Sequence, residues 1–245
     1  RKLNSVWQKS THGIRFADSM RMYLWGKQTM GDTRKYRNID ALRTFGCLAI
    51  IAWHVKANTG FSPGGVLDKV IPSFDYLVYL FMIISGFGMC NGYYQKLKTG
   101  TYSIDAFYSK RYKRTVPFFA LLILLNCVTE FTPKTVCEGL MEITMLFGFL
   151  PNNTLSTIGV AWTLGAIFAF YIIFPFIVFL LYSPKRGIVS FVISLVITYM
   201  CQCYFMTERF VTENFVMRHS FLYCLPYFLI GGIVYLYKDE IERFV

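Results

Sequence analysis

The sequence predicts an all-α, polytopic transmembrane helix bundle, because three observations agree. Hydrophobic residues make up 55% of the 245-residue chain and charged residues only 16%, a balance that is unusual for a soluble domain. The mean hydropathy is +0.43, and the apolar runs are long enough to cross a bilayer as helices. Most of the basic residues lie between alternate apolar runs, as expected of the loops on the cytoplasmic side.

Apolar runs of about 17 to 25 residues predict six transmembrane helices. They cover residues 42–58, 74–94, 115–132, 159–182, 187–206 and 217–237. A further apolar stretch, residues 139–151, is too short for a confident span, so we expect a short re-entrant or interfacial helix there. The expected fold is therefore a bundle of about six spans plus this short helix.

Two regions are predicted along the chain, a basic extension over residues 1–36 and a membrane domain over residues 37–245. Of the 25 Lys and Arg residues, 20 fall in segments on one side of the predicted membrane, among them the extension and residues 95–115. This bias predicts a multi-pass protein of the cell membrane with both termini in the cytoplasm. The extension either lies on the inner leaflet as an amphipathic stretch or is a solvated, disordered segment.

The composition also argues against two classes of partner. A formal net charge of +11 would suggest nucleic acid only if basic residues shared one face with exposed aromatic residues, whereas the aromatic residues here lie in the apolar runs. The seven cysteines lie mostly in those runs too, with no histidine at ligand spacing, so we expect buried thiols and no metal. The predicted surroundings are a lipid bilayer and no nucleic acid.

The first predicted span carries the most informative pair of residues, Arg43 and His54. Eleven residues advance a helix by about three turns and about 16 Å, which puts both side chains on one face. A titratable group near the middle of a bilayer is costly, so His54 is a candidate general base, although a packing role is the alternative. Arg43 alone is an ordinary interfacial residue, for which Asp40 is a possible ion-pair partner.

Other segments supply further candidates. Arg111 and Arg114 lie three residues apart at the cytoplasmic start of the third span, where guanidinium groups suit phosphate, although a positive-inside cluster looks the same. Ser85 begins a Ser-Gly-Phe motif typical of close helix packing. Trp162 opens an aromatic span that either lines a cavity or packs. His12 and His219 are weaker candidates, since one lies in the extension and the other at an outer boundary.

Taken together, these motifs have a recognisable order. The D-x-L-R-x10-H start, the SGF of the second span, the R-x-x-R at the third and the W-[ST]-L…FY…P span resemble those of the acyltransferase-3 family, which includes bacterial polysaccharide O-acetyltransferases. The resemblance runs from about residue 37 to residue 237. It implies a membrane-bound O-acyltransferase that moves an acyl group, by family frequency acetyl, from cytoplasmic acyl-CoA to a hydroxyl of a cell-envelope glycan or its lipid-linked precursor.

The resemblance also assigns roles to residues. Arg43 and His54 match the catalytic R-x10-H pair, and Arg111 and Arg114 match the motif associated with the acyl-CoA donor. His54 would act as the general base on the acceptor hydroxyl or carry the acyl group transiently. No metal is implied.

Two departures from the family pattern bear on these expectations. Many members carry an acidic residue shortly after the W-S-L motif, where this chain has Ile167, and Glu130 is a speculative substitute. The family core also has more spans than the six expected here, so the chain is expected to be truncated at its C-terminus. Two other classes of protein stay open, a transporter or flippase for lipid-linked sugars and a non-catalytic membrane partner that keeps the acyltransferase fold.

Overall fold

The computed structural model describes residues 36–150, 157–207, 209 and 216–244. Every regular element in these ranges is helical, and they contain no strand, which confirms the all-α fold class. The predicted extension lies outside the described residues except for Tyr36, and so does His12.

The described elements follow one another along the chain as a series of helices and short helical turns. They are α2 (Arg37–Thr59), α3 (Gly65–Val70), η1 (Ile71–Tyr76), α4 (Leu77–Met89), the π-helical turn η2 (Cys90–Tyr94), α5 (Gln95–Lys98), α6 (Ile104–Thr129), α7 (Pro133–Ile143), η3 (Phe147–Phe149), α8 (Ala161–Leu180), α9 (Pro184–Met200), the π-helical turn η4 (Cys201–Phe205), η5 (Met217–His219), α10 (Phe221–Leu236) and α11 (Lys238–Phe244).

Several of these helices are long and apolar enough to cross a membrane, as expected of a multi-pass membrane protein. Four qualify in the described part of the chain, namely Gly65–Lys98, Ile104–Thr129, Ala161–Leu180 and Pro184–Phe205. The pair α10 and α11, bent by 68°, is a possible fifth. The predicted count of six is not confirmed, because α2 is not among these candidates. Arg43 and His54, the candidate site residues of α2, lower the mean hydropathy of this helix.

The helices gather around a core in which α4 and α10 cross most closely. A Cβ atom on Gly86 of α4 would lie 2.1 Å from the carbonyl oxygen of Phe228, and one on Gly231 of α10 would lie 2.0 Å from that of Ile83. Only glycine permits such an approach of two backbones. The packing role predicted for the SGF motif therefore holds at Gly86.

Two sequence-based boundaries are corrected by the structure. The helix of the third predicted span starts at Ile104 instead of residue 115. Ser103 is its N-cap residue, and its side chain accepts a hydrogen bond from the N–H of Ala106. The first turns of this helix carry charged residues, which suit a helix that projects beyond the apolar layer of the membrane. Hydropathy alone therefore placed the start of the helix too late. The predicted short helix at 139–151 lies earlier, at Pro133–Ile143, and the chain turns at Met145, whose φ is 60°. Its 11 residues span about 16 Å, too little to cross a bilayer.

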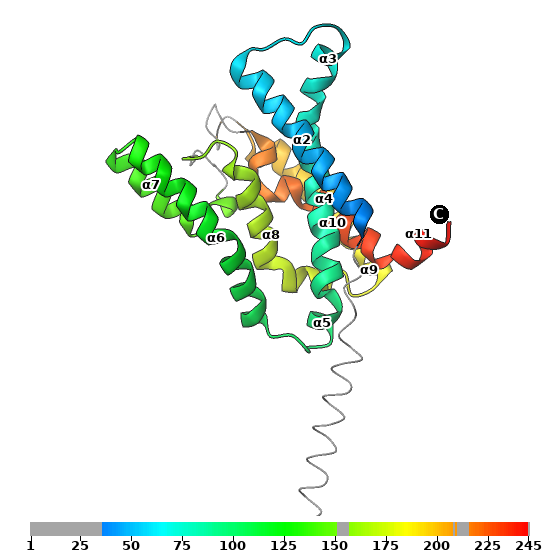
Figure 1. Ribbon diagram of the computed structural model, residues 1–245. Helices are drawn as coiled ribbons and strands as arrows, with labels where there is room; N and C mark the ends of the chain where they lie inside the picture. Colours follow the sequence, from blue (N-terminus) through cyan, green and yellow to red (C-terminus); the bar gives the residue numbers. More distant parts are fainter. Residues whose placement is uncertain (1–35, 151–156, 208, 210–215, 245) are drawn as a thin grey trace, which may run out of the picture.

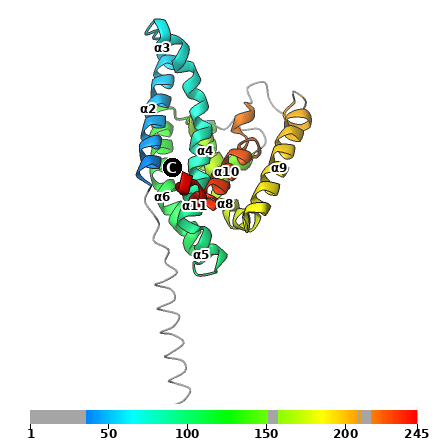
Figure 2. The same ribbon diagram turned by 90° about the vertical axis from the view of Figure 1, so that its right-hand side faces the viewer.

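The two ends of the helix bundle are marked by different short helices, α3 and α5. Helix α2 runs beside α4, with α3 at one end and α5 at the other (Figure 1). An ion pair between Lys56 and Asp68 ties the α3 end of this hairpin together. Helix α9 stands out on the far side of α10 (Figure 2) and exposes many apolar side chains, as expected of a helix that faces lipid.

Candidate functional site

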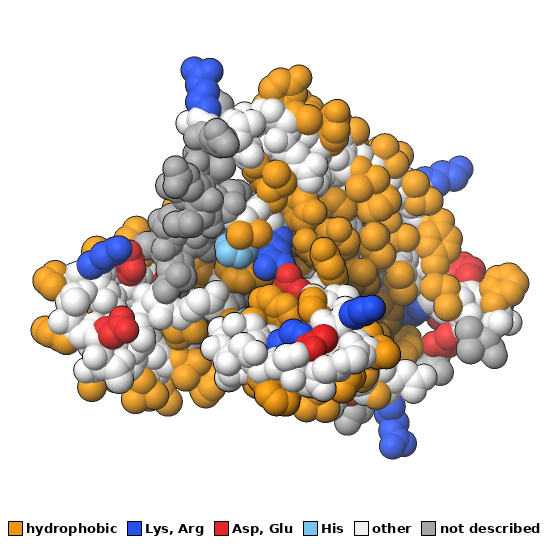
Figure 3. Space-filling view, turned by 90° about the horizontal axis from the view of Figure 1, so that it is seen from above, with side chains coloured by type: hydrophobic (Ala, Val, Ile, Leu, Met, Phe, Trp, Pro, Cys, Tyr) orange, Lys and Arg blue, Asp and Glu red, His pale blue; other side chains and the backbone are white. Residues whose placement is uncertain are grey.

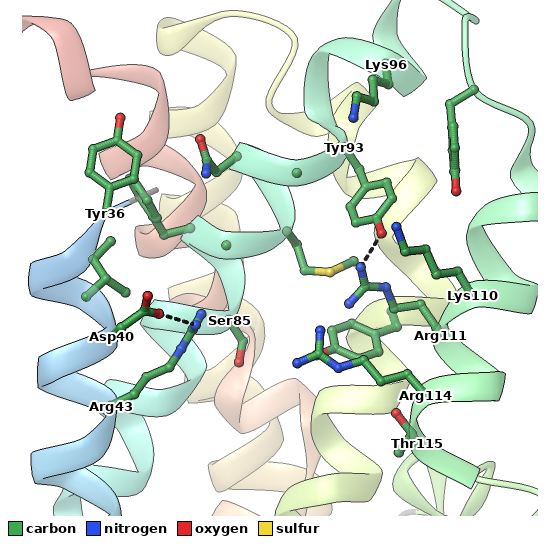
Figure 4. A pocket seen from close by; sticks show the side chains of 18 residues that line it. Tyr36, Asp40, Arg43, Ser85, Tyr93, Lys96, Lys110, Arg111, Arg114 and Thr115 are labelled. Atoms are coloured by element: carbon green, nitrogen blue, oxygen red, sulfur yellow. Dashed lines mark hydrogen bonds and ion pairs between the residues drawn. The ribbon is translucent and has the colours of Figure 1, made fainter. Parts of the chain in front are cut away.

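A cavity of about 810 Å³ opens near the α5 end of the bundle and gathers residues from α2, α4, η2, α6 and α8. We call it the arginine cavity, because Arg43, Arg111 and Arg114 all line it (Figure 4). Arg43 reaches in from α2, and the other two arginines reach in from α6 on the opposite side. The structure thus brings together three of the four site residues predicted from the sequence.

Arg43 is held only loosely in this cavity. Its Nη1 atom lies 3.3 Å from Oδ1 of Asp40, which confirms the predicted ion pair, but 43% of the Arg43 side chain is exposed. A pair as exposed as this contributes little stability, so the guanidinium keeps donors for a ligand. Gly88 of α4 makes room for it, since a Cβ atom there would lie 3.1 Å from Nη2 of Arg43.

Arg111 is held more firmly, by aromatic side chains. Its Nη2 atom donates a hydrogen bond to the hydroxyl of Tyr93. Its Cζ atom lies 4.6 Å from the ring centroid of Tyr93 and 5.4 Å from that of Tyr171, within the range of a cation–π contact. Tyr171 belongs to the FY motif, so the aromatic span supplies a lining residue here.

The charges of the arginine cavity are strongly one-sided. Lys96 and Lys110 join the three arginines, and Asp40 is the one carboxylate among the described lining residues. Ser85 also lines the cavity, so the SGF motif serves the site as well as the packing. Clustered guanidinium and ammonium groups with so little compensation favour a polyanionic ligand such as one that carries several phosphates.

His54 lies in a different place, a second cavity of about 540 Å³. We call it the histidine cavity, because both His54 and His219 line it, and α2, α8 and η5 contribute to its wall. Figure 3 looks onto the α3 end of the molecule and shows a histidine beside a basic and an acidic side chain, in a hollow among apolar side chains.

A network of charged and aromatic side chains organises the histidine cavity. Arg218 and Asp75, which both line the cavity, form an ion pair. The ring of His219 stacks on that of Trp162, with centroids 4.5 Å apart, and the Cζ atom of Arg218 lies 5.7 Å from the same indole. Trp162 of the W-T-L motif is therefore a cavity residue that two neighbours hold in place.

This surrounding keeps His219 neutral. His219 precedes α10 and lies outside the candidate spans. Burial lowers the pKa of its imidazole, the nearby Arg218 also lowers it, and Asp75 opposes the shift, so that the pKa lies at about 4. At neutral pH His219 therefore offers one donor and one acceptor nitrogen and no charge. Since Arg218 is paired with Asp75, the charged residues of this cavity balance, in contrast to the arginine cavity.

Helices α2 and α8 each contribute residues to both cavities. Arg43 and His54 lie eleven residues apart on one continuous helix, about 16 Å along its axis, and each lines its own cavity. Helix α8 links the same two places, because Trp162 lines the histidine cavity and Tyr171 lines the arginine cavity. The cavities thus lie near opposite ends of α2, and at the start and the middle of α8.

The acidic residue that many family members carry after the W-S-L motif has no counterpart in either cavity at the two positions that the sequence suggested, Ile167 and Glu130. Ile167 packs against the apolar core, and Glu130 is exposed at the end of α6. Neither is among the residues that line the two cavities. Glu142 of α7 is fully buried, but its Oε1 atom accepts a hydrogen bond from the N–H of Thr157, and burial raises its pKa. Asp75 is the carboxylate that lines the histidine cavity.

Sequence reasoning missed Asp75 and Arg218 and named His219 only as a weaker candidate. Asp75 belongs to η1, whereas Arg218 and His219 belong to η5, far along the chain, and the ion pair between Asp75 and Arg218 joins the two segments. An isolated basic residue and histidine beside an apolar run were the available signals. Tyr93 had none, because it belongs to no motif.

Comparison with known proteins agrees with this geometry. The family model described as "Acyltransferase domain", that of the acyltransferase-3 family, matches residues 36–245, so the match begins at Tyr36, a lining residue of the arginine cavity. A protein of Haemophilus influenzae (strain ATCC 51907 / DSM 11121 / KW20 / Rd), named "Uncharacterized protein", is 26% identical over 185 residues, which cover 65% of this chain and 74% of that protein. No solved structure matches the chain. The match over nearly all described residues confirms the resemblance of the four motifs, and the chain belongs to the acyltransferase-3 family of membrane acyltransferases.

Proposed function

We propose that this chain is a membrane-bound O-acyltransferase that takes an acyl group, most simply acetyl, from cytoplasmic acyl-CoA. The acceptor is a hydroxyl of a cell-envelope glycan or of its lipid-linked precursor. The observation that carries the proposal is the arginine cavity, in which Arg43, Arg111 and Arg114 from two separate helices meet beside two lysines.

The residues of the arginine cavity fit the donor. Guanidinium groups bind phosphate oxygens through paired hydrogen bonds, and CoA carries a pyrophosphate and a further phosphate. The Nε–H of Arg111 is buried and has no hydrogen-bond partner among the described residues. We therefore assign Arg111 and Arg114 to the donor phosphates, with Arg43 on the facing side of the cavity.

The histidine cavity suits the acceptor. The acyl-CoA thioester supplies an activated acyl group. His54 accepts the proton of the acceptor hydroxyl while the hydroxyl oxygen bonds to the acyl carbon. The carbon–sulfur bond of the thioester then breaks, and the departing CoA thiolate receives that proton from His54. In the covalent variant, the imidazole of His54 carries the acyl group first and passes it to the hydroxyl. Both variants require the pantetheine arm of the donor to reach from the arginine cavity toward His54.

Incubating membranes that contain the full-length protein with acetyl-labelled acetyl-CoA tests this proposal. We expect transfer of label to a glycan or lipid-linked fraction, because the cavities supply a donor site and a base. His54→Ala should abolish the transfer, and Arg111→Ala should raise the KM for acetyl-CoA about tenfold or more, since a lost charged hydrogen bond costs about 1.5–3 kcal/mol. Label that stays on the protein after rapid denaturation at neutral pH, where an acyl-imidazole survives longer than in acid, would identify the covalent variant.

Matched control variants are available on the same helices. Lys113 lies between the two arginines but is exposed and not among the lining residues, so Lys113→Ala should leave the KM unchanged. Val55, exposed beside His54, gives the control Val55→Ala. Full transfer by a folded His54→Ala variant contradicts the role of His54. Movement of the acceptor across the membrane without acylation would favour a transporter instead.

A further inference from the structure

Tyr93 occupies an unusual position in the backbone. It lies in η2, a five-residue π-helical turn that interrupts the long helical stretch Gly65–Lys98. Such turns are rare and frequently occur at functional sites. Here two consecutive tyrosines of the turn point to different parts of the structure. The hydroxyl of Tyr94 donates to the carbonyl oxygen of Leu181 at 2.8 Å, whereas Tyr93 lines the arginine cavity.

The contacts of Tyr93 converge on one guanidinium group. Its ring is only 7% exposed and is fixed by edge contact with Phe107, with centroids 5.1 Å apart, and by Tyr102 at 5.6 Å. Its hydroxyl accepts the hydrogen bond from Nη2 of Arg111 (Figure 4). A buried, immobile phenol therefore sets the orientation of a side chain that would otherwise be free to adopt many rotamers.

The orientation that results leaves Arg111 with unused donors. Its Nε–H is buried and has no hydrogen-bond partner in the described part of the chain. Because this atom has no accessible surface and Nη2 donates to Tyr93, the remaining Nη1 group is the donor left for a ligand in the cavity that Arg111 lines. The tyrosine thus accepts one donor of Arg111 and helps to hold the group in place for the oxygens of a ligand.

We propose that Tyr93 is a positioning residue for donor binding. Through its hydroxyl it holds the Arg111 guanidinium in the orientation that binds a phosphate group of the acyl-CoA. This inference rests on the proposed function, since it assumes that the arginine cavity takes the donor. It assigns Tyr93 no contact with the reacting atoms, so its loss should affect donor affinity and KM while kcat stays nearly unchanged.

Equilibrium binding of CoA to the full chain in lipid nanodiscs, measured by calorimetry, tests the proposal. Tyr93→Phe keeps the ring and removes only the hydroxyl. We expect it to raise the Kd of CoA about tenfold, because Arg111 loses its fixed orientation. Arg111→Ala should raise the Kd at least as much. The double variant should bind no more weakly than Arg111→Ala alone, since a positioning residue has nothing left to position.

Tyr108→Phe is the matched control. The hydroxyl of Tyr108, on the same helix as Arg111, donates to the carbonyl oxygen of Ile172 at 2.6 Å, and Tyr108 is not among the residues that line the cavity. Its loss should lower the melting temperature and leave the Kd unchanged. An unaltered Kd in Tyr93→Phe, or additive effects in the double variant, would overturn the role of Tyr93 alone. Absence of CoA binding by the unsubstituted chain would overturn the proposed function as well.

Discussion

At the scale of single residues, the motif arginines were predictable and their neighbours were not. Arg43, Arg111 and Arg114 belong to motifs, and the cavity that they share agrees with the resemblance from which their roles were inferred. His219 was judged a weak candidate because it lies at the end of an apolar run. Its place in the histidine cavity depends on packing between segments that are far apart in the sequence, and spacing along the chain carries no information on such a meeting.

The neutral state of His219 predicts a pH dependence of stability. Its pKa is lowered to about 4 in the folded protein and is about 6.5 in the unfolded chain. Between these values the unfolded chain binds more protons, so the folded state loses stability as the pH falls from about 6.5 to about 4. His219→Asn removes this titration. The melting temperature of the unsubstituted protein should therefore fall relative to that of the variant over this range.

Thermal unfolding in detergent at pH 7 and at pH 4.5 measures the effect. An identical pH dependence of the two melting temperatures would contradict the burial of a neutral His219.

At the scale of elements, hydropathy located the helices better than it located their ends. Each of the six predicted runs overlaps a helix, but α6 begins at Ile104, earlier than its apolar run. The residues that hydropathy discarded, Arg111 and Arg114, lie within this helix and line the cavity. Functional residues at the border of a membrane are polar, so the same feature that serves the site hides the start of the helix.

The crossing of α4 and α10 gives a prediction at this scale. In Gly86→Ala the new Cβ atom would lie 2.1 Å from a backbone carbonyl oxygen, so one of the two helices has to shift. Overpacking of this kind typically costs about 1–3 kcal/mol and occasionally more. We expect a large loss of folded protein, measured as a lower melting temperature in detergent.

A second glycine of the same helical stretch is the control. A Cβ atom on Gly92 would meet no heavy atom within 4 Å, so Gly92→Ala should leave the melting temperature unchanged or raise it slightly. Equal stability of Gly86→Ala and Gly92→Ala would contradict the close crossing.

At the scale of the whole molecule, the expected orientation in the membrane is open to direct test. Residues 95–115 contain six of the basic residues, whereas residues 60–64, between α2 and α3, contain none. Cytoplasmic loops keep such an excess of Lys and Arg. Fluorescent-protein and alkaline-phosphatase fusions at two sites measure the orientation. A fusion after Gly100 should fluoresce and lack phosphatase activity, and one after Ser62 should behave in the opposite way.

The reverse pattern would place the arginine cavity on the side where no acyl-CoA is available, and the proposed donor site would then be wrong.

The sequence predicted an all-helical membrane protein and the structure agrees. The number of spans was not predictable in the same way, because α2 is polar enough to fall short on composition alone.

In the proposed function, the unbroken helix α2 sets a minimum length for the donor. A continuous helix neither stretches nor shortens, so the interval of about 16 Å between Arg43 and His54 is fixed. A donor that is held at the arginine cavity and reacts at His54 must then carry its activated carbonyl on a long flexible stem. Small acyl phosphates lack that reach, so the proposed site should exclude them by their length.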